Sequence, residues 1–332
     1  MVEGGHIITL TTGAWRLHTH LRTSSYGELW RAAAVPGGVP AVIKFVNRAQ
    51  MAQALAPQRA LWRDSFDAEI AFLRSLQPWD QRHIVRLLDS GTHDGMPALA
   101  LELLDGDLSA HLERLRARGQ RPGVAQALAW TAQVNGALAK VHQYGWRYLD
   151  LKPSNLLVDA RTGAVKLADF GTNRPLADAA AHAYAGTAAW QAPEQFFPDD
   201  AGRYRTDART DYFALGALLY RLVAGVPLRY GETCAKAYRM HGPAGADVLR
   251  ARHGGALPPT LGADEAARFA ALAAQATGGD PGGDTGALVA LLRALLAPRP
   301  QDRPRHALDI SRAIAQAGAA LASPRPALRS AA

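Results

Sequence analysis

Two short polar runs in a fixed order constrain this chain more than any other feature. Residues 150–155 read DLKPSN, which places a carboxylate, an ammonium and a carboxamide on one short loop. Residues 169–171 read DFG and add a second carboxylate, and residues 156–168 between the runs suffice for one hairpin. One such match can arise by chance, but two in this order and at this spacing are much harder to obtain. The fold has to accommodate both.

The residue types in these runs are those that phosphoryl transfer requires. A carboxylate such as Asp150 can orient the attacking hydroxyl, and an ammonium such as Lys152 can stabilise the transferring phosphate. The amide oxygen of Asn155 and the carboxylate of Asp169 are suited to the metal ions that bridge the phosphates. We therefore predict Asp150 and Lys152 as catalytic residues. Asn155 and Asp169 are predicted ligands of Mg²⁺, or of Mn²⁺ in its place.

Length and composition bound the class of protein. The 332 residues allow one two-lobed unit or two small domains, and a hydrophobic content of 48% is typical of a globular chain. The formal net charge is +8, but the basic residues are scattered along the chain. A nucleic-acid platform would concentrate them in a patch, so no nucleic-acid partner is indicated.

Export and membrane anchoring are not indicated either. No apolar run approaches the roughly 20 residues that span a bilayer. The first residues, MVEGGH, are neither basic nor followed by a long apolar core. The single cysteine, Cys234, excludes an internal disulfide and is best explained as a small, half-buried apolar residue. We expect a cytoplasmic protein without a membrane anchor.

Residue patterns predict an α+β fold, with a small sheet-rich part followed by a larger helical part. The predicted elements are strands within 7–46 that end with a buried strand at 41–46, a helix at about 57–76, strands at 84–88 and 98–103, and helices at 108–118, 124–144 and 211–224. We divide the chain into residues 1–104, residues 105–317 and a tail at 318–332 whose composition predicts disorder. The segment at about 229–286 matches no clear pattern.

Further motifs in the same order resemble the protein kinase family, and in particular the bacterial eukaryotic-like Ser/Thr protein kinases. Residues 21–29 (LRTSSYGEL) lie where these kinases carry a glycine-rich loop. Lys44 ends a buried strand, and Glu69 lies on the helix that follows. Residues 186–187 (GT) and 192–194 (APE) resemble the substrate-docking end of an activation segment. The resemblance implies a two-lobed kinase fold with a hinge near residues 103–104.

Two structural positions extend this resemblance to about residues 20–312. Asp211, at the start of an apolar helix, matches the aspartate that anchors the backbone of the catalytic loop. Arg303 matches the cation that pairs with Glu194 in the interior. Both are implied to support the site rather than to take part in the reaction.

The resemblance also implies roles for residues around the nucleotide and the substrate. Thr187 is implied as a third catalytic residue that bonds Asp150 and Lys152. The residues implied to surround ATP are Leu21, Gly27, Leu29, Val42, Lys44, Glu69, Leu101, Glu102, Leu103, Asp107 and Leu157. Lys44 and Glu69 would form the clamp on the phosphates.

The glycine-rich loop departs from the family pattern. Gly27 is kept, but Arg22 and Ser24 replace the other two glycines. Because fewer backbone amides can then approach the phosphates, we expect weaker ATP binding than in a glycine-complete loop.

The catalytic loop and the activation segment also depart from the pattern. Leu149 replaces the arginine that normally precedes the catalytic aspartate and pairs with a phosphate on the segment. Tyr184 is the only hydroxyl residue in 173–186. We therefore expect a segment that reaches its working shape without phosphorylation, held by Phe170, Trp190 and the Glu194–Arg303 pair.

The expected function is transfer of the ATP γ-phosphate to Ser or Thr hydroxyls of a protein substrate, with regulation by a partner protein or by abundance. Two alternatives stay open. A pseudokinase that serves as a binding scaffold is favoured by the degenerate glycine-rich loop and the missing arginine at position 149, and opposed by Lys44, Asp150, Asn155 and Asp169. A small-molecule phosphotransferase of related fold is opposed by the motifs at residues 186–187 and 192–194, because that segment serves a peptide substrate.

Overall fold

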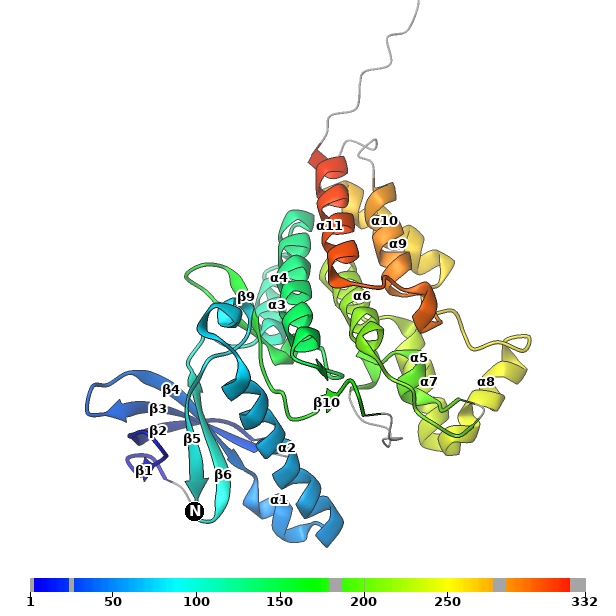
Figure 1. Ribbon diagram of the computed structural model, residues 1–332. Helices are drawn as coiled ribbons and strands as arrows, with labels where there is room; N and C mark the ends of the chain where they lie inside the picture. Colours follow the sequence, from blue (N-terminus) through cyan, green and yellow to red (C-terminus); the bar gives the residue numbers. More distant parts are fainter. Residues whose placement is uncertain (1–2, 24–26, 179–186, 200, 277–284, 323–332) are drawn as a thin grey trace, which may run out of the picture. The chain divides into compact units, whose positions relative to one another are not determined.

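The chain forms two compact units. The computed structural model describes residues 3–23, 27–178, 187–199, 201–276 and 285–322 (Figure 1). The first unit comprises residues 1–106 and 157–173, and the second comprises 107–156 and 174–332. Residues 157–173 join the first unit through backbone hydrogen bonds such as Val85 N to Leu167 O (2.9 Å). The lobe boundary after residue 104 stays a prediction.

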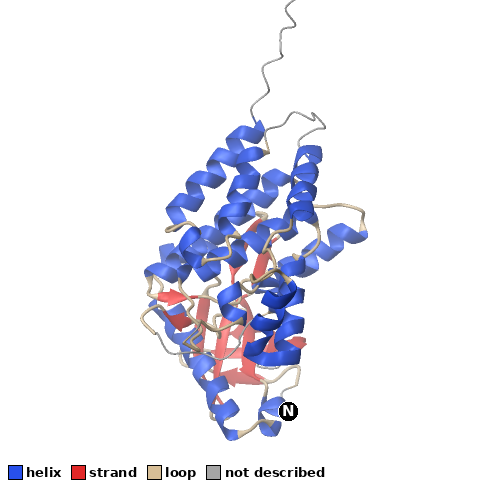
Figure 2. Cartoon of the chain, turned by 90° about the vertical axis from the view of Figure 1, so that its right-hand side faces the viewer, coloured by secondary structure: helices blue, strands red, loops and turns tan. Residues whose placement is uncertain are grey.

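An antiparallel sheet forms the centre of the first unit. Its strands are β1 (Ile7–Thr9), β2 (Ala14–Thr23), β3 (Gly27–Val35), β4 (Pro40–Val46), β5 (Leu87–His93) and β6 (Met96–Glu102). They lie in the order β1-β2-β3-β4-β6-β5, drawn in red in Figure 2. The first unit also contains helices and a hairpin. These are the helices α1 (Arg48–Gln53) and α2 (Ala56–Ser75), the 3₁₀ helix Pro78–His83, and the two-stranded pair of β8 (Leu156–Asp159) and β9 (Ala164–Leu167).

The alternation of side chains along β4 decides which residues are available for a site. Ala41, Ile43 and Phe45 are buried in the core of the sheet with Trp15 and Leu17. Successive side chains of a strand point to opposite faces. Val42 and Lys44 therefore lie on the other face and stay partly accessible.

The second unit is helical. Its helices are α3 (Leu108–Ala117), α4 (Val124–Gln143), α5 (Pro193–Phe196), α6 (Ala208–Ala224), α7 (Arg229–His241), α8 (Gly245–Arg252), α9 (Ala263–Ala276), α10 (Gly286–Leu295) and α11 (Ala307–Ala322). Two short strands, β7 (Trp146–Arg147) and β10 (Arg174–Pro175), form a small antiparallel pair. Nearly every side chain of α6 is buried, as expected for a helix that is apolar on all sides, and α4, α9 and α10 pack against it.

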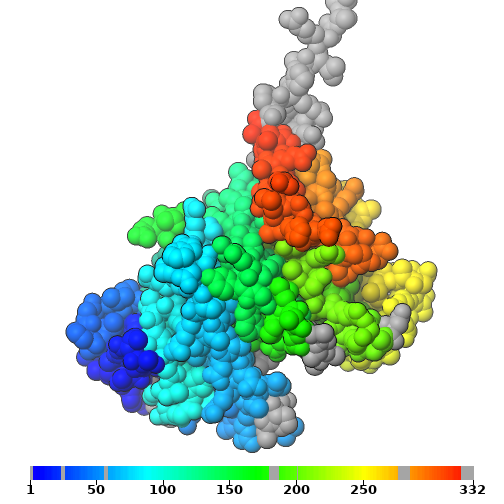
Figure 3. Space-filling view, in the orientation of Figure 1, coloured from blue at the N-terminus to red at the C-terminus, as the bar shows by residue number. Residues whose placement is uncertain are grey.

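Close packing fixes the neighbours of α6. A Cβ atom at Gly216 would lie 2.8 Å from Cβ of Leu295 and 3.0 Å from the side chain of Leu296, so only glycine allows this approach of α6 and the end of α10. The helices α10 and α11, orange and red in Figure 3, pack side by side. This helical core supports the loop that carries Asp150, through Asp211 of α6.

Most predicted elements are present, with shifts at the edges. The predicted strand 84–88 begins only at Leu87, because the 3₁₀ helix extends to His83 and Ile84 forms an isolated bridge with Leu167. Residues 318–322 of the predicted tail are helical, since α11 buries Ile310, Ile314 and Ala317 on one face. Residues 323–332 lie outside the described part. The segment 229–286 contains α7, α8 and α9. None of the helices in the described residues is both long and apolar enough to cross a membrane.

Candidate active site

A lysine and two carboxylates form a compact cluster in the first unit. Lys44 Nζ donates to Glu69 Oε2 at 2.6 Å and to Asp169 Oδ1 at 2.8 Å. Glu69 is fully buried on the inner face of α2, and its other oxygen accepts from Phe170 N at 3.1 Å. Burial alone would lower the pKa of Lys44, but the carboxylates of Asp169 and Glu69 outweigh it and hold this pKa well above its usual range. The ammonium is therefore a permanent positive charge beside the exposed Asp169 carboxylate.

The backbone around Asp169 is fixed by its neighbours. The Phe170 ring is fully buried and lies 4.6 Å from the Phe72 ring, measured between centroids. Ser65 Oγ donates to Gly171 O. A Cβ atom at Gly171 would lie 2.5 Å from Ser65 Oγ, which is too close, so a side chain at this position would displace Ser65. Asp169 itself has a φ of 61°, in the left-handed region that is rare for residues other than glycine. The Asp169 side chain is 52% exposed, although it is paired with Lys44, whose side chain is only 12% exposed.

The second unit brings four of the predicted site residues together. Lys152 Nζ donates to Asp150 Oδ2 at 2.6 Å and to Thr187 Oγ1 at 2.9 Å. Thr187 Oγ1 donates to Asp150 Oδ1 at 3.2 Å. Asn155 Nδ2 donates to Asp150 Oδ2 at 3.1 Å and to Asp150 O at 3.0 Å. The contacts expected of Thr187 are present, and the Asp150 carboxylate is held in one orientation while 8% of the residue remains accessible.

Asp211 holds the loop that carries Asp150. Its carboxylate accepts from Tyr148 N at 2.8 Å and from Leu149 N at 2.7 Å, as the resemblance implies. It also contacts His142 Nε2 at 2.8 Å, and Gln195 Nε2 donates to Leu149 O at 3.0 Å. Leu149 has a φ of 67°, so the turn before the catalytic aspartate is strained and depends on these bonds. Sequence reasoning missed His142 and Gln195; the position of Gln195 directly after the APE motif was the available signal.

The Glu194–Arg303 pair fixes the end of the segment that carries Thr187. Arg303 Nη1 and Nη2 donate to the two Glu194 oxygens at 2.6 and 2.9 Å. The Arg303 side chain is fully buried and lies 5.0 Å from the centroid of the Phe213 ring. A bidentate pair of this kind is strong and directional, so the residues just after Thr187 are anchored to the helical core.

Several residues predicted to bind ATP share one face of the sheet. Leu29 lies opposite Lys44 in the β3–β4 register, and Val42 lies opposite Leu101 in the β4–β6 register. Directly opposed residues of an antiparallel pair share a face. These four side chains therefore form one continuous patch, with apolar groups next to the Lys44 ammonium.

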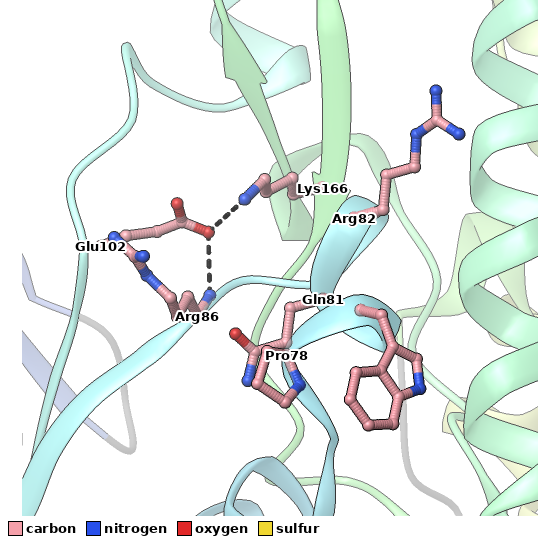
Figure 4. A pocket seen from close by; sticks show the side chains of 7 residues that line it. Pro78, Gln81, Arg82, Arg86, Glu102 and Lys166 are labelled. Carbon is pink, nitrogen blue, oxygen red and sulfur yellow. Dashed lines mark hydrogen bonds and ion pairs between the residues drawn. The ribbon is translucent and has the colours of Figure 1, made fainter.

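The side chain of Glu102, another predicted ATP residue, is engaged elsewhere. Its Oε1 accepts from Lys166 Nζ at 2.6 Å and from Arg86 N at 2.8 Å (Figure 4). These groups line a pocket of about 420 Å³ together with Pro78, Trp79, Gln81 and Arg82. Any contact of Glu102 with a nucleotide would therefore use its backbone rather than its carboxylate.

The remaining predicted residues lie at the ends of elements or outside the described residues. Leu21 lies on β2, Leu103 follows β6, and Leu157 lies on β8. Asp107 is the N-cap of α3, where its side chain accepts from Ala110 N at 2.9 Å. Ser24, Tyr184 and Gly186 fall outside the described residues.

Each unit contains one of the predicted metal ligands. In the described residues there is no group of three or more His, Cys, Asp or Glu side chains able to hold a metal ion. The predicted ligands are oxygen donors, Asp169 in the first unit and Asn155 in the second. Mg²⁺ prefers oxygen donors of this kind and usually keeps waters and substrate phosphates as its other ligands.

Comparisons with known proteins agree with these features. The chain is similar to the serine/threonine-protein kinase PknL of Mycobacterium tuberculosis, with 36% identity over 155 residues, or 46% of this chain and 37% of the relative. It is similar to the serine/threonine-protein kinase PkaA of Streptomyces coelicolor, with 34% identity over 243 residues, 68% of this chain and 41% of the relative. The DNA damage-responsive serine/threonine-protein kinase RqkA of Deinococcus radiodurans is 34% identical over 169 residues, 48% of this chain and 24% of the relative.

These alignments span less than half the length of each relative. The family described as protein kinase domain matches residues 18–310, nearly the whole range over which the sequence motifs occur. The match confirms the resemblance and the two-lobed α+β fold class predicted from the motifs. The chain therefore belongs to the protein kinase family.

Proposed function

We propose that the chain transfers the γ-phosphate of ATP to Ser or Thr hydroxyls of protein substrates. The observation that supports this proposal best is the Asp150 network, in which one carboxylate is oriented by Lys152, Asn155 and Thr187. An oriented, partly accessible carboxylate can accept the hydroxyl proton while the Lys152 ammonium faces the developing charge. The cytoplasmic location expected from the sequence is part of the proposal.

Lys44 is proposed to bind the α- and β-phosphates of ATP. Its pairing with the buried Glu69 keeps the ammonium in place, and its raised pKa keeps it charged. Asp169 and Asn155 are the residues that would hold Mg²⁺ or Mn²⁺, which supplies charge neutralisation between the phosphates when it is bound. The face formed by Leu29, Val42 and Leu101 is the proposed contact for the adenine ring.

The two alternatives are less well supported. A scaffold without activity does not require the hydrogen bonds that orient Asp150. A small-molecule phosphotransferase does not require Thr187 to be tied to Asp150 by a segment anchored at Glu194. These arrangements favour a catalytic site that receives a peptide.

Two measurements separate an enzyme from a scaffold. We expect ATP with Mg²⁺ to raise the thermal midpoint of the protein, and ATP with a chelator to raise it less. Labelled ATP should then transfer its γ-phosphate to a general protein substrate. Nucleotide binding without any transfer would favour the pseudokinase, and transfer to small alcohols or amines alone would favour the second alternative.

We also propose that this activity does not depend on phosphorylation of the activation segment. Leu149 cannot pair with a phosphate, and Tyr184 is the only hydroxyl residue in 173–186. The test is to treat the protein with phosphatase, confirm by mass spectrometry that residues 172–190 carry no phosphate, and compare initial rates. A large loss of rate that recovers on rephosphorylation of Thr172, Tyr184 or Thr187 would refute this proposal.

A further inference from the structure

A buried arginine lies directly before the catalytic loop. Arg147 lies on the short strand β7, opposite Arg174 on β10, and only 3% of the residue is exposed. Its Nη1 donates to the backbone oxygen of Thr206 at 3.1 Å, and its Nη2 donates to the backbone oxygen of Asp178 at 2.9 Å. The guanidinium thus joins three chain segments that are far apart in sequence.

Burial of the charged Arg147 guanidinium costs desolvation free energy, which its hydrogen bonds have to offset. Among the described residues, no carboxylate lies within ion-pair distance of Arg147, and its Nε has no hydrogen-bond partner. Burial lowers the pKa of Arg147, only partly offset by the more distant Asp178, Asp211 and Asp207 carboxylates. An apolar residue would fill the same space at lower cost. A guanidinium is required here only because its fork of donors can reach two carbonyl oxygens at once.

The two acceptors mark the ends of one functional segment. Asp178 follows β10 by a few residues, and Thr206 immediately precedes Asp207, the N-cap of α6. The chain between them contains Thr187, which bonds Asp150, and Glu194, which is anchored by Arg303. Arg147 is thus bound to both ends of the segment that presents Thr187, while it is itself continuous with the loop of Asp150.

We propose that Arg147 is a positioning residue, which holds the two ends of the segment 174–207 through the backbone carbonyls of Asp178 and Thr206 instead of through a phosphate. Phosphates order such segments by pairing with arginine. Here the arginine binds acceptors that are always present, so the segment needs no modification. The expected effect of Arg147 on phosphotransfer rests on the proposed kinase function. The role of Arg147 in holding the backbone at Asp178 and Thr206 rests on the structure alone.

Hydrogen–deuterium exchange with mass spectrometry tests the conformational part. We expect Arg147→Met to speed amide exchange in peptides covering 174–178 and 203–208 by at least about tenfold, with little change in α9 and α10. Arg147→Lys, which keeps the charge but cannot bridge two carbonyls, should give most of the same increase. Arg252→Met, at an exposed arginine of α8, is the matched control and should exchange like wild type.

Steady-state kinetics test the positioning role. We expect Arg147→Lys to lower kcat/KM for the protein substrate by about tenfold or more, because the charged guanidinium no longer donates to both backbone carbonyls. The KM for ATP should stay near the wild-type value. Exchange in 174–178 and 203–208 that is unchanged in both Arg147 variants would overturn the inference. So would equal losses for both substrates, which indicate general destabilisation. If wild type shows no phosphotransfer, the proposed function fails, while the exchange experiment still decides whether Arg147 holds the segment. If Arg147→Met does not fold, Arg147→Lys supplies both results.

Discussion

The Glu194–Arg303 pair should be among the strongest single contributions to the stability of the helical unit. Arg303 Nε, Nη1 and Nη2 donate not only to Glu194 but also to the backbone oxygens of Ala297, Arg209 and Pro298, at 2.8 to 3.1 Å. Arg303→Met would leave the Glu194 carboxylate, 11% exposed, with Thr210 Oγ1 as its one remaining side-chain donor among the described residues. Removing one partner of a buried ion pair costs about 3–5 kcal/mol.

Thermal and urea unfolding measure this cost. For a unit of this size, about 2–4 °C is lost per kcal/mol, so the Tm of Arg303→Met should fall by roughly 6–20 °C. Arg299→Met is the matched control, because Arg299 pairs with Asp302 on the surface, with side chains 70% and 40% exposed. Such a pair contributes at most about 1 kcal/mol. A loss below about 1 kcal/mol in Arg303→Met, or equal losses in both variants, would refute the reasoning.

Three further predictions concern the loop anchor, the buried thiol and the glycine-rich loop. Asp211→Asn replaces an acceptor oxygen by an NH₂ donor, so one of the two loop amides loses its hydrogen-bond partner. The free energy of unfolding should therefore fall by about 1–3 kcal/mol, and kcat should fall as well. An unchanged midpoint of urea unfolding would contradict this prediction. Burial raises the pKa of Cys234 from 9.0 to about 11. Because the folded protein then binds the proton more tightly than the unfolded chain, unfolding free energy should decrease as pH rises through this range, and Cys234→Ala should remove that part of the slope. Native protein should also resist iodoacetamide at pH 8. Restoring glycine at Arg22 and Ser24 should tighten ATP binding in a titration, and weaker binding would mean that one of these side chains contacts the nucleotide.

Much of the site could be predicted because its residues act through local chemistry and fixed order. Strand periodicity places Lys44 on the accessible face of β4, and helical spacing places Glu69 on the buried face of α2. The contacts of Thr187 with Asp150 followed from the family motifs. Motifs therefore predict which side chains meet when each lies on a regular element or a short loop.

Other features depend on tertiary packing that no local pattern records. Nothing in the residues near Arg147 indicates that its guanidinium reaches Thr206, since the two residues are remote in sequence. The engagement of the Glu102 carboxylate by Lys166 likewise joins two residues that are remote in sequence. The predicted strand 84–88 begins only at Leu87, because Ile84 and Val85 pair with Leu167, a residue remote in sequence.

Phosphotransfer by wild type and by Asp150→Ala, measured with labelled ATP, Mg²⁺ and a protein substrate, tests the proposed function most directly. Asp247→Ala, at an 80% exposed aspartate of α8, is the matched control. We predict that Asp150→Ala lowers the rate by about 100-fold or more, the scale of a lost positioned base, while ATP binding changes little. Asp247→Ala should label the substrate at the wild-type rate. Equal labelling by wild type and Asp150→Ala would contradict the assignment of Asp150 and, with it, the proposed enzyme.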